Sequence, residues 1–293
     1  MASAKPAEPR VFHNHFMPRF WDLDTWRHVN NTAMVQLHQE ARVQALVELL
    51  GADAWFSDGP RLRPLRSVTQ FRRVTRYGAP VISQTRIQAV SGQHFRMRTD
   101  LFQHDECVGC QDSIMGAFLD CGPVELPGPQ RTALQTADIA ALEGSPEPLA
   151  PPVYLDGPEL AEAFAVVKTL TPRYGDLDVD SQRAESALAR YVEQSRFGVV
   201  DRLPFGGQGM LIALLDMTFH HYRAGSEPVE LAAAVPRVGN SSFSLRTSVF
   251  SNGKPQATAD SIMVVVNTGS ERPEPMNSAL REQLATLDYP GSR

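Results

Sequence analysis

Pro18-Arg19-Phe20-Trp21-Asp22-Leu23-Asp24 is repeated with two substitutions as Pro172-Arg173-Tyr174-Gly175-Asp176-Leu177-Asp178, at an offset of 154 residues. A second stretch, Asp112-Ser113-Ile114-Met115, is repeated unchanged as Asp260-Ser261-Ile262-Met263, at an offset of 148. A deletion of six residues from the second copy, between these stretches, accounts for both offsets. The sequence therefore predicts an internal duplication, which constrains the architecture before any single motif is interpreted.

The repeat extends between the two quoted stretches. From Phe71 to Met115 the copies align without a gap, and eight positions have identical partners 148 residues later: Phe71, Pro80, Val81, Val90, Phe95, Arg98, Thr99 and Phe102. Each candidate functional residue consequently has a counterpart in the other half, which serves as a control.

Composition sets broad limits on the class of protein. The chain has 293 residues, 42% hydrophobic and 21% charged, which is enough for two domains with cores of their own. A net charge of −5 argues against a nucleic-acid-binding surface. We find no apolar run long enough to span a membrane and no signal-peptide pattern near the N-terminus, and three cysteines cannot form a disulfide framework. We expect a cytoplasmic protein.

The same order of elements is predicted in each copy: a strand, an Asp-x-Asp turn, a long helix, several strands and a short closing helix. The long helices are expected at 31–50, ending at Gly51, and at 181–203. In the second copy the strands are expected at 211–222, 229–238, 241–250 and 257–266. A Pro- and Gly-rich linker at 143–158 divides the chain into predicted domains 1–145 and 146–293.

These elements predict an α+β architecture built on antiparallel sheets. An amphipathic helix must bury its apolar stripe, and a curved sheet wrapped around it does so. Each copy alone leaves one sheet edge unpaired, so we expect the two edges to join into one continuous sheet.

The motif that carries chemistry is Asp22-Leu23-Asp24-Thr25-Trp26-Arg27-His28-Val29-Asn30-Asn31, between a predicted strand and a predicted helix. The free N–H groups at a helix N-terminus attract negative charge. A carboxylate base beside such an oxyanion site is what acyl transfer requires.

This string, followed by Gln39-Glu40-Ala41-Arg42, resembles the hotdog-fold acyl-thioester hydrolases of the 4-hydroxybenzoyl-CoA and acyl-ACP thioesterase type. The closing stretch Arg272-Pro273-Glu274-Pro275-Met276 is also similar to that family. The resemblance covers both halves. It implies a tandem double hotdog, in which two long helices are each wrapped by an antiparallel sheet to form a pseudo-dimer, acting on thioesters of coenzyme A or acyl carrier protein without a cofactor.

The resemblance also implies three site residues. The second Asp of the Asp-x-Asp pair is the family's catalytic carboxylate, which places that role on Asp24. The oxyanion donor of the 4-hydroxybenzoyl-type members corresponds to the backbone N–H of Asn31. The plant-type members use an Asp-x-Asn-x-His set, which Asp24 and His28 match, although Trp26 stands where that set has Asn.

Each assignment has a structural alternative. Asp24 is also typical of a turn or cap residue, and His28 of a residue that hydrogen-bonds the backbone at a helix start. In the second copy Gln182 replaces His28, and Glu185 replaces Asn31. We expect the second copy to be weakened, because Asp180 and Glu185 would repel an anionic thioester.

Other functions remain open at this point. A hotdog dehydratase or hydratase and a non-catalytic acyl-CoA-binding protein are the alternatives to a hydrolase. Neither Cys107 and Cys110 nor His220 and His221 is accompanied by further ligands at metal-binding spacing, so no metal site is predicted. Because one chain carries both copies, we expect a monomer to be competent, with a homodimer of such chains as an addition rather than a requirement.

Overall fold

The computed structural model describes residues 10–52, 55, 58–119, 122–139, 164, 166–222, 225 and 227–287. The first half contains these elements in order: β1 (Phe12–Phe16), η1 (Phe20–Asp22), α1 (Asn31–Leu50), β2 (Arg61–Phe71), β3 (Val81–Gln88), β4 (His94–Gln103), β5 (Glu106–Leu119), β6 (Gly122–Val124) and α3 (Gly128–Thr136). The predicted linker and the domain boundary at 145/146 lie outside the described residues.

The second half has a matching series. Its elements are β7 (Val166–Leu170), η3 (Tyr174–Asp176), α4 (Glu185–Val200), β8 (Gln208–Phe219), β9 (Val229–Val238), β10 (Ser242–Ser251), β11 (Lys254–Asn267) and α5 (Ser278–Ala285). None of the helices among the described residues has the length and apolar character needed to cross a bilayer.

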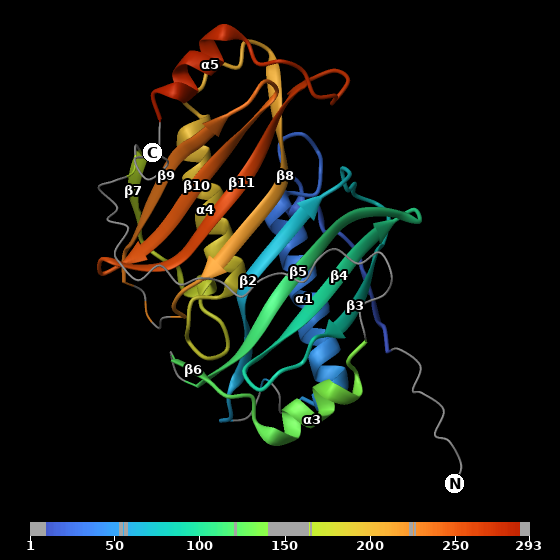
Figure 1. The fold of residues 1–293 in the computed structure, drawn as a ribbon. Helices are drawn as coiled ribbons and strands as arrows, with labels where there is room; N and C mark the ends of the chain where they lie inside the picture. Colours follow the sequence, from blue (N-terminus) through green and yellow to red (C-terminus); the bar gives the residue numbers. More distant parts are fainter. Residues whose placement is uncertain are drawn as a thin grey trace.

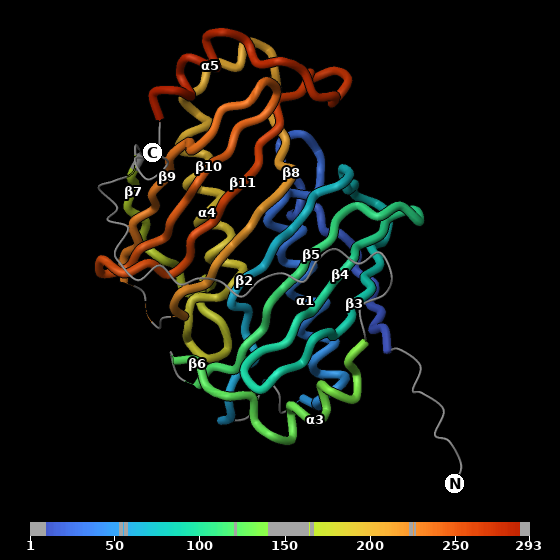
Figure 2. Tube along the Cα trace, viewed as in Figure 1, coloured from blue at the N-terminus to red at the C-terminus, as the bar shows by residue number. Residues whose placement is uncertain are grey.

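One antiparallel sheet runs through the molecule, with β2 and β8 side by side in the middle (Figures 1 and 2). Its order is β1-β3-β4-β5-β2-β8-β11-β10-β9-β7, and β6 pairs with the far end of β5. Counted outward from the centre, the strands of both halves therefore follow the same sequence order. The predicted α+β fold with antiparallel strands is confirmed.

The register at the centre is symmetric. Val68 of β2 pairs with Asp216 of β8, and these positions are 148 residues apart. Each strand also has a bulge at an equivalent place, at Leu65 opposite β5 and at Ala213 opposite β11. Residues of β2 can consequently be matched to residues of β8 by the same offset of 148.

Both long helices lie on one face of the sheet, behind it in Figure 1, and they bury their apolar stripes there. Ala45 and Leu46 of α1 pack with Phe95 and Met97 of β4. The apolar stripe of α4 packs in the same way on β8 and β9 of its own half. Each fully buried large side chain contributes roughly 1.5–3 kcal/mol, so these two interfaces hold the helices on the sheet.

Most predicted boundaries agree with the structure. Helix α1 spans Asn31–Leu50 as predicted and ends at Gly51, whose φ of 84° suits glycine. The prediction for α4 is wrong at its start, because residues 178–182 form a turn with Ser181 at φ 57°, and the helix begins only at Glu185.

Candidate active site

The turn before α1 positions Asp24 and His28. Oδ1 of Asp24 accepts hydrogen bonds from the backbone N–H groups of Trp26 at 2.8 Å and His28 at 3.0 Å. The Asp24 N–H in turn donates to the His28 carbonyl, and Arg27 takes a φ of 63° to close the turn. One oxygen of Asp24 therefore has the structural role that the turn interpretation predicted. In the described part of the chain, Oδ2 has no hydrogen-bond partner.

His28 is buried and reaches the second half of the chain. Its Nε2 lies 3.2 Å from Oε1 of Glu271, which follows β11. The Trp26 ring packs edge-on to the imidazole, with centroids 6.1 Å apart. The side chain of His28 is thus held by Glu271 and Trp26.

Asn31 is the first residue of α1, after the N-cap Asn30, whose side chain accepts from the Thr32 N–H. Within the described ranges, the backbone N–H of Asn31 has no acceptor. Its side chain is clamped by α4 of the other half: Oδ1 accepts from Arg196 at 2.6 Å, and Nδ2 donates to Glu193 at 3.1 Å. Both contacts fix the residue whose N–H is the predicted oxyanion donor.

Arg196 is a buried cation at this site. Burial lowers the pKa of its guanidinium to about 10, although the negative charge of the Glu193 carboxylate acts in the opposite direction. The group therefore remains charged at neutral pH. Its other hydrogen bond goes to the Ser261 hydroxyl at 3.2 Å, so its hydrogen-bond partners are neutral oxygens.

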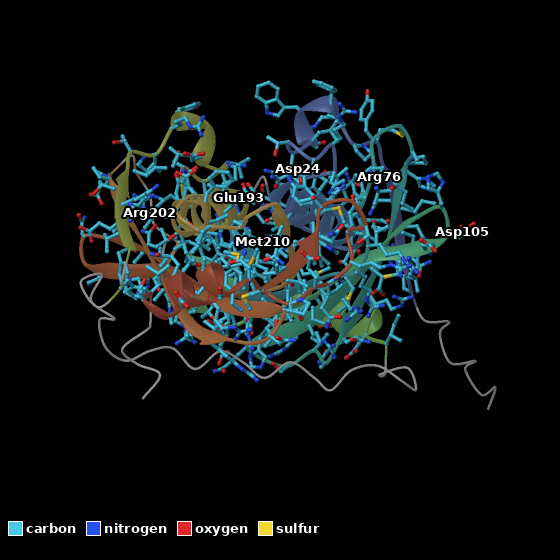
Figure 3. All side chains as sticks on the ribbon, turned by 90° about the horizontal axis from the view of Figure 1, so that it is seen from above. Asp24, Arg76, Asp105, Glu193, Arg202 and Met210 are labelled. Atoms are coloured by element: carbon cyan, nitrogen blue, oxygen red, sulfur yellow. The ribbon has the colours of Figure 1, made fainter. Side chains whose placement is uncertain are left out.

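A cavity of about 840 Å³ brings these residues together where the two halves meet. Figure 3 shows Asp24, Glu193 and Met210 near the middle of the molecule, with Asp105 and Arg202 toward opposite ends. The three predicted site residues, Asp24, His28 and Asn31, all line the cavity. Much of the remaining wall is apolar and comes from both halves: Met34, Phe71, Phe197, Phe205, Met210, Leu211, Ile212 and Met263.

Trp26 forms part of the same wall and depends on a glycine opposite. A Cβ on Gly209 of β8 would lie 2.0 Å from Cη2 of Trp26. The side chain of any other residue at position 209 would therefore clash with the indole. Because Gly209 has no side chain, the Trp26 ring can lie against β8 in the cavity wall.

The equivalent region of the second half is smaller and filled by charge pairs. Its cavity of about 240 Å³ is lined by residues that include Asp178, Glu185, Arg42 and Tyr222. Asp178 makes the same turn as Asp24, accepting from the N–H groups of Asp180 and Gln182. Its other oxygen, however, is bound by Nη1 of Arg63 at 2.5 Å.

Two further carboxylates in this region are also neutralised. Asp180 is bound by Arg61 at 3.0 Å and by Arg63 at 2.7 Å, and Glu185 by Arg42 at 2.6 Å. The expectation that Asp180 and Glu185 repel an anion as free charges is therefore wrong. The physical reason is that three arginines of the first half reach across and pair with them.

The counterparts of these arginines explain the difference between the two regions. By the 148-residue offset, Arg61 and Arg63 of β2 correspond to Gly209 and Leu211 of β8. The position near Asp24 that is equivalent to Arg63 is thus occupied by the uncharged Leu211. Among the described residues, the Asp24 carboxylate of the larger cavity thus has one oxygen without a partner, whereas the carboxylates of the smaller cavity are held in ion pairs.

Three residues of the site were missed from the sequence. Glu193, Arg196 and Glu271 belong to the second half, whereas the motif lies in the first. Arg196 stands 154 residues after Arg42, at the offset of the repeated Asp-x-Asp stretch, and Glu271 directly precedes the closing stretch that begins at Arg272. Neither feature of the sequence identified a role for these residues. Among the described residues, no group of three or more metal-binding side chains is placed to hold an ion.

No family model matches the chain, and no curated protein matches it. Its structure is similar to the 12:0-ACP thioesterase from Umbellularia californica, with a TM-score of 0.71 and 17% identity over 90% of this chain and 98% of that one. An acyl-ACP thioesterase from Bacteroides thetaiotaomicron matches with a TM-score of 0.62 and 13% identity over 86% and 97% of the two chains. The tesB protein of Mycobacterium avium subspecies paratuberculosis matches at 0.53, with 12% identity over 87% and 92%. The chain thus shares the fold of hotdog-type thioesterases over nearly its whole length.

Proposed function

We propose that this protein is a thioesterase that hydrolyses acyl thioesters of coenzyme A or acyl carrier protein to the free acid and the thiol. The observation that carries the proposal is that one cavity is lined both by Asp24 and by Asn31 at the start of α1. Among the described residues, Oδ2 of Asp24 has no hydrogen-bond partner and the Asn31 N–H has no acceptor. The shared fold with the acyl-ACP thioesterases supports the same conclusion.

In the proposed reaction Oδ2 of Asp24 takes a proton from water, and the water oxygen attacks the thioester carbonyl carbon. Direct attack by Asp24 as a nucleophile, followed by hydrolysis of the anhydride, is the alternative for the same residue. The Asn31 N–H and the positive end of the α1 dipole stabilise the oxyanion. The carbon–sulfur bond then breaks, and the thiolate leaves and takes up the proton.

The other residues orient and desolvate the substrate in this proposal. His28 orients the thioester, and the apolar wall from both halves receives the acyl group. Burial in an apolar cavity strengthens the electrostatic contribution of the nearby Arg196 and of the helix N-terminus.

We further propose that the chain is a tandem double hotdog with domains 1–145 and 146–293, arranged as a pseudo-dimer. The symmetric β2–β8 register and the identical strand orders support this arrangement. A single chain then contains a complete site, and a homodimer is not required for activity. The composition supports action in the cytoplasm.

The test is a thiol-release assay over a panel of aliphatic and aromatic acyl-CoA and acyl-ACP substrates, with Asp24→Asn and Asp178→Asn as matched variants. Asn keeps the Oδ1 acceptor that both turns need, so both variants should fold. Asp24→Asn should lower kcat by about 10²–10⁴-fold, the usual effect of removing a catalytic base. Asp178→Asn should lower kcat per folded molecule less than threefold.

Other outcomes point to other conclusions. Equal losses in the two variants would mean that both regions are active. Substrate binding without thiol release in the wild type would favour the acyl-CoA-binding alternative. Conversion of a 3-hydroxyacyl or enoyl thioester without thiol release would favour the dehydratase or hydratase.

A further inference from the structure

The turn that follows β11 holds Glu271 where its side chain contacts the first half of the chain. Oδ1 of Asn267 accepts hydrogen bonds from the N–H groups of Gly269 and Ser270, each at 3.0 Å. The Glu271 N–H donates to the Asn267 carbonyl at 2.8 Å, and the Asn267 N–H donates to the Arg272 carbonyl at 3.0 Å. These bonds fix the backbone of the turn on both sides of Glu271.

Glu271 itself has a conformation that glutamate rarely adopts. Its φ is 54°, in the left-handed region, where a side chain is disfavoured. Left-handed residues other than glycine are found most often where the surrounding structure or a functional role requires them. Here the conformation coincides with a side chain that reaches the other half of the molecule.

The contact with His28 defines which ring nitrogen carries the proton. An ionised carboxylate only accepts hydrogen bonds, so Nε2 of His28 must be the donor to Oε1 of Glu271 at 3.2 Å. The second oxygen of Glu271 lies 3.8 Å from Nη2 of Arg76. In the neutral ring this leaves Nδ1 as the hydrogen-bond acceptor.

We propose that Glu271 is a positioning residue of the second half that holds His28 in its Nε2–H form, so that Nδ1 can accept a hydrogen bond from the attacking water. The proposal rests on the proposed thioesterase function and adds a residue to its site. The second half would then contribute a polar group to the reaction rather than only a wall.

The test uses the full chain labelled with ¹⁵N-histidine, measured where an ordinary histidine is neutral, with His28 assigned from a His28→Gln spectrum. In the wild type the His28 ring nitrogens should show the Nε2–H form. Glu271→Ala should shift them toward a mixture of both forms and should lower kcat/KM at least tenfold, since loss of the correct tautomer has a large effect on histidine-dependent catalysis. The control is Glu282→Ala, which removes an exposed carboxylate from α5 and should change neither the His28 resonances nor kcat/KM.

The outcomes separate this inference from the proposed function. Unchanged His28 resonances in Glu271→Ala, or changed resonances with unchanged kcat/KM, would overturn the role of Glu271. If the wild type releases no thiol from any substrate while the resonances still shift in Glu271→Ala, the contact stands and the hydrolase proposal fails.

Discussion

Differences between single residues at equivalent positions of the two halves decide in which region the carboxylates form ion pairs with arginines. Asp24 and Asp178 make the same turn, but Asp178 is bound by Arg63, whereas the position equivalent to Arg63 near Asp24 is Leu211. In the same way Asn31 offers Arg196 a neutral oxygen, whereas Glu185 forms an ion pair with Arg42. A site of this kind is shaped by the residue type opposite the motif as much as by the motif itself.

Gly209 offers a test at this scale. In Gly209→Ala the new Cβ must displace the Trp26 ring, which is 37% exposed and can move outward. We expect a stability loss of about 1 kcal/mol or less, a Tm decrease of roughly 2–4 °C at most, and a raised KM because Trp26 lines the cavity. Gly122→Ala, where a Cβ meets nothing within 4 Å, should change neither quantity in thermal unfolding and steady-state assays. An unchanged KM in Gly209→Ala would show that Trp26 does not contact the substrate.

At the scale of elements, α1 and the β4–β5 hairpin each contain a residue that local rules do not favour. His38 is a fully buried histidine on α1, and neither ring nitrogen has a hydrogen-bond partner in the described residues. The β4–β5 hairpin turns through His104 and Asp105, both at positive φ, where the β10–β11 hairpin uses Asn252 and Gly253. Both features predict measurable effects on stability.

His38 should make the protein less stable in acid. Burial lowers the pKa of His38 well below 6.5, and the positive charges of Arg42 and Arg98 lower it further. Burial also lowers the pKa of His220, to about 4. Below about pH 6.5 the unfolded chain takes up protons that the folded chain does not, so the free energy of unfolding falls as the pH falls. Each such histidine contributes up to about 1.4 kcal/mol per pH unit.

Chemical denaturation between neutral pH and pH 5 measures this effect. His38→Gln should flatten the dependence on pH, whereas His104→Gln, on an exposed turn, should leave it as in the wild type. Equal slopes for the wild type and His38→Gln would contradict the assignment.

The two hairpins provide a matched pair of predictions. Asp105→Gly should stabilise the protein by about 0.5 kcal/mol, because glycine adopts a φ of 64° without a steric penalty. Gly253→Ala should destabilise it by about 1 kcal/mol, because its φ of 70° is unfavourable for alanine. Thermal unfolding measures both, and thiol release should not change. If Asp105→Gly destabilised the protein and Gly253→Ala stabilised it, the backbone conformations assigned to these two turns would be wrong.

At the scale of the whole molecule, the two halves complete each other. The central strands are joined by backbone pairing and by Arg66, whose Nη2 lies 2.6 Å from Oδ2 of Asp216. Across the same seam α4 holds Asn31, and the turn after β11 holds His28. The open cavity therefore does not exist in either half alone.

Splitting the chain tests this dependence. Residues 1–145 and 146–293 expressed separately should each expose an unpaired β2 or β8 edge, aggregate, and release no thiol. Their coexpression should restore activity, because the β2–β8 pairing can form between separate chains. Dilution of the intact protein to the monomer should leave kcat unchanged. Wild-type activity from 1–145 alone, or loss of activity on dilution, would contradict a site completed within one chain.

The amino-acid sequence by itself determined the local features: the limits of α1, the β10–β11 turn, the α+β class and the presence of Asp24, His28 and Asn31 around one helix start. These depend on neighbours a few residues apart, whose spacing is readable in one dimension. Only the tertiary structure decided that Glu193, Arg196 and Glu271 reach this site from the second half, and that Arg61 and Arg63 form ion pairs with the carboxylates of the other region. Those contacts join residues more than 100 positions apart, and they follow from the β2–β8 register and the helix packing, which no local spacing encodes.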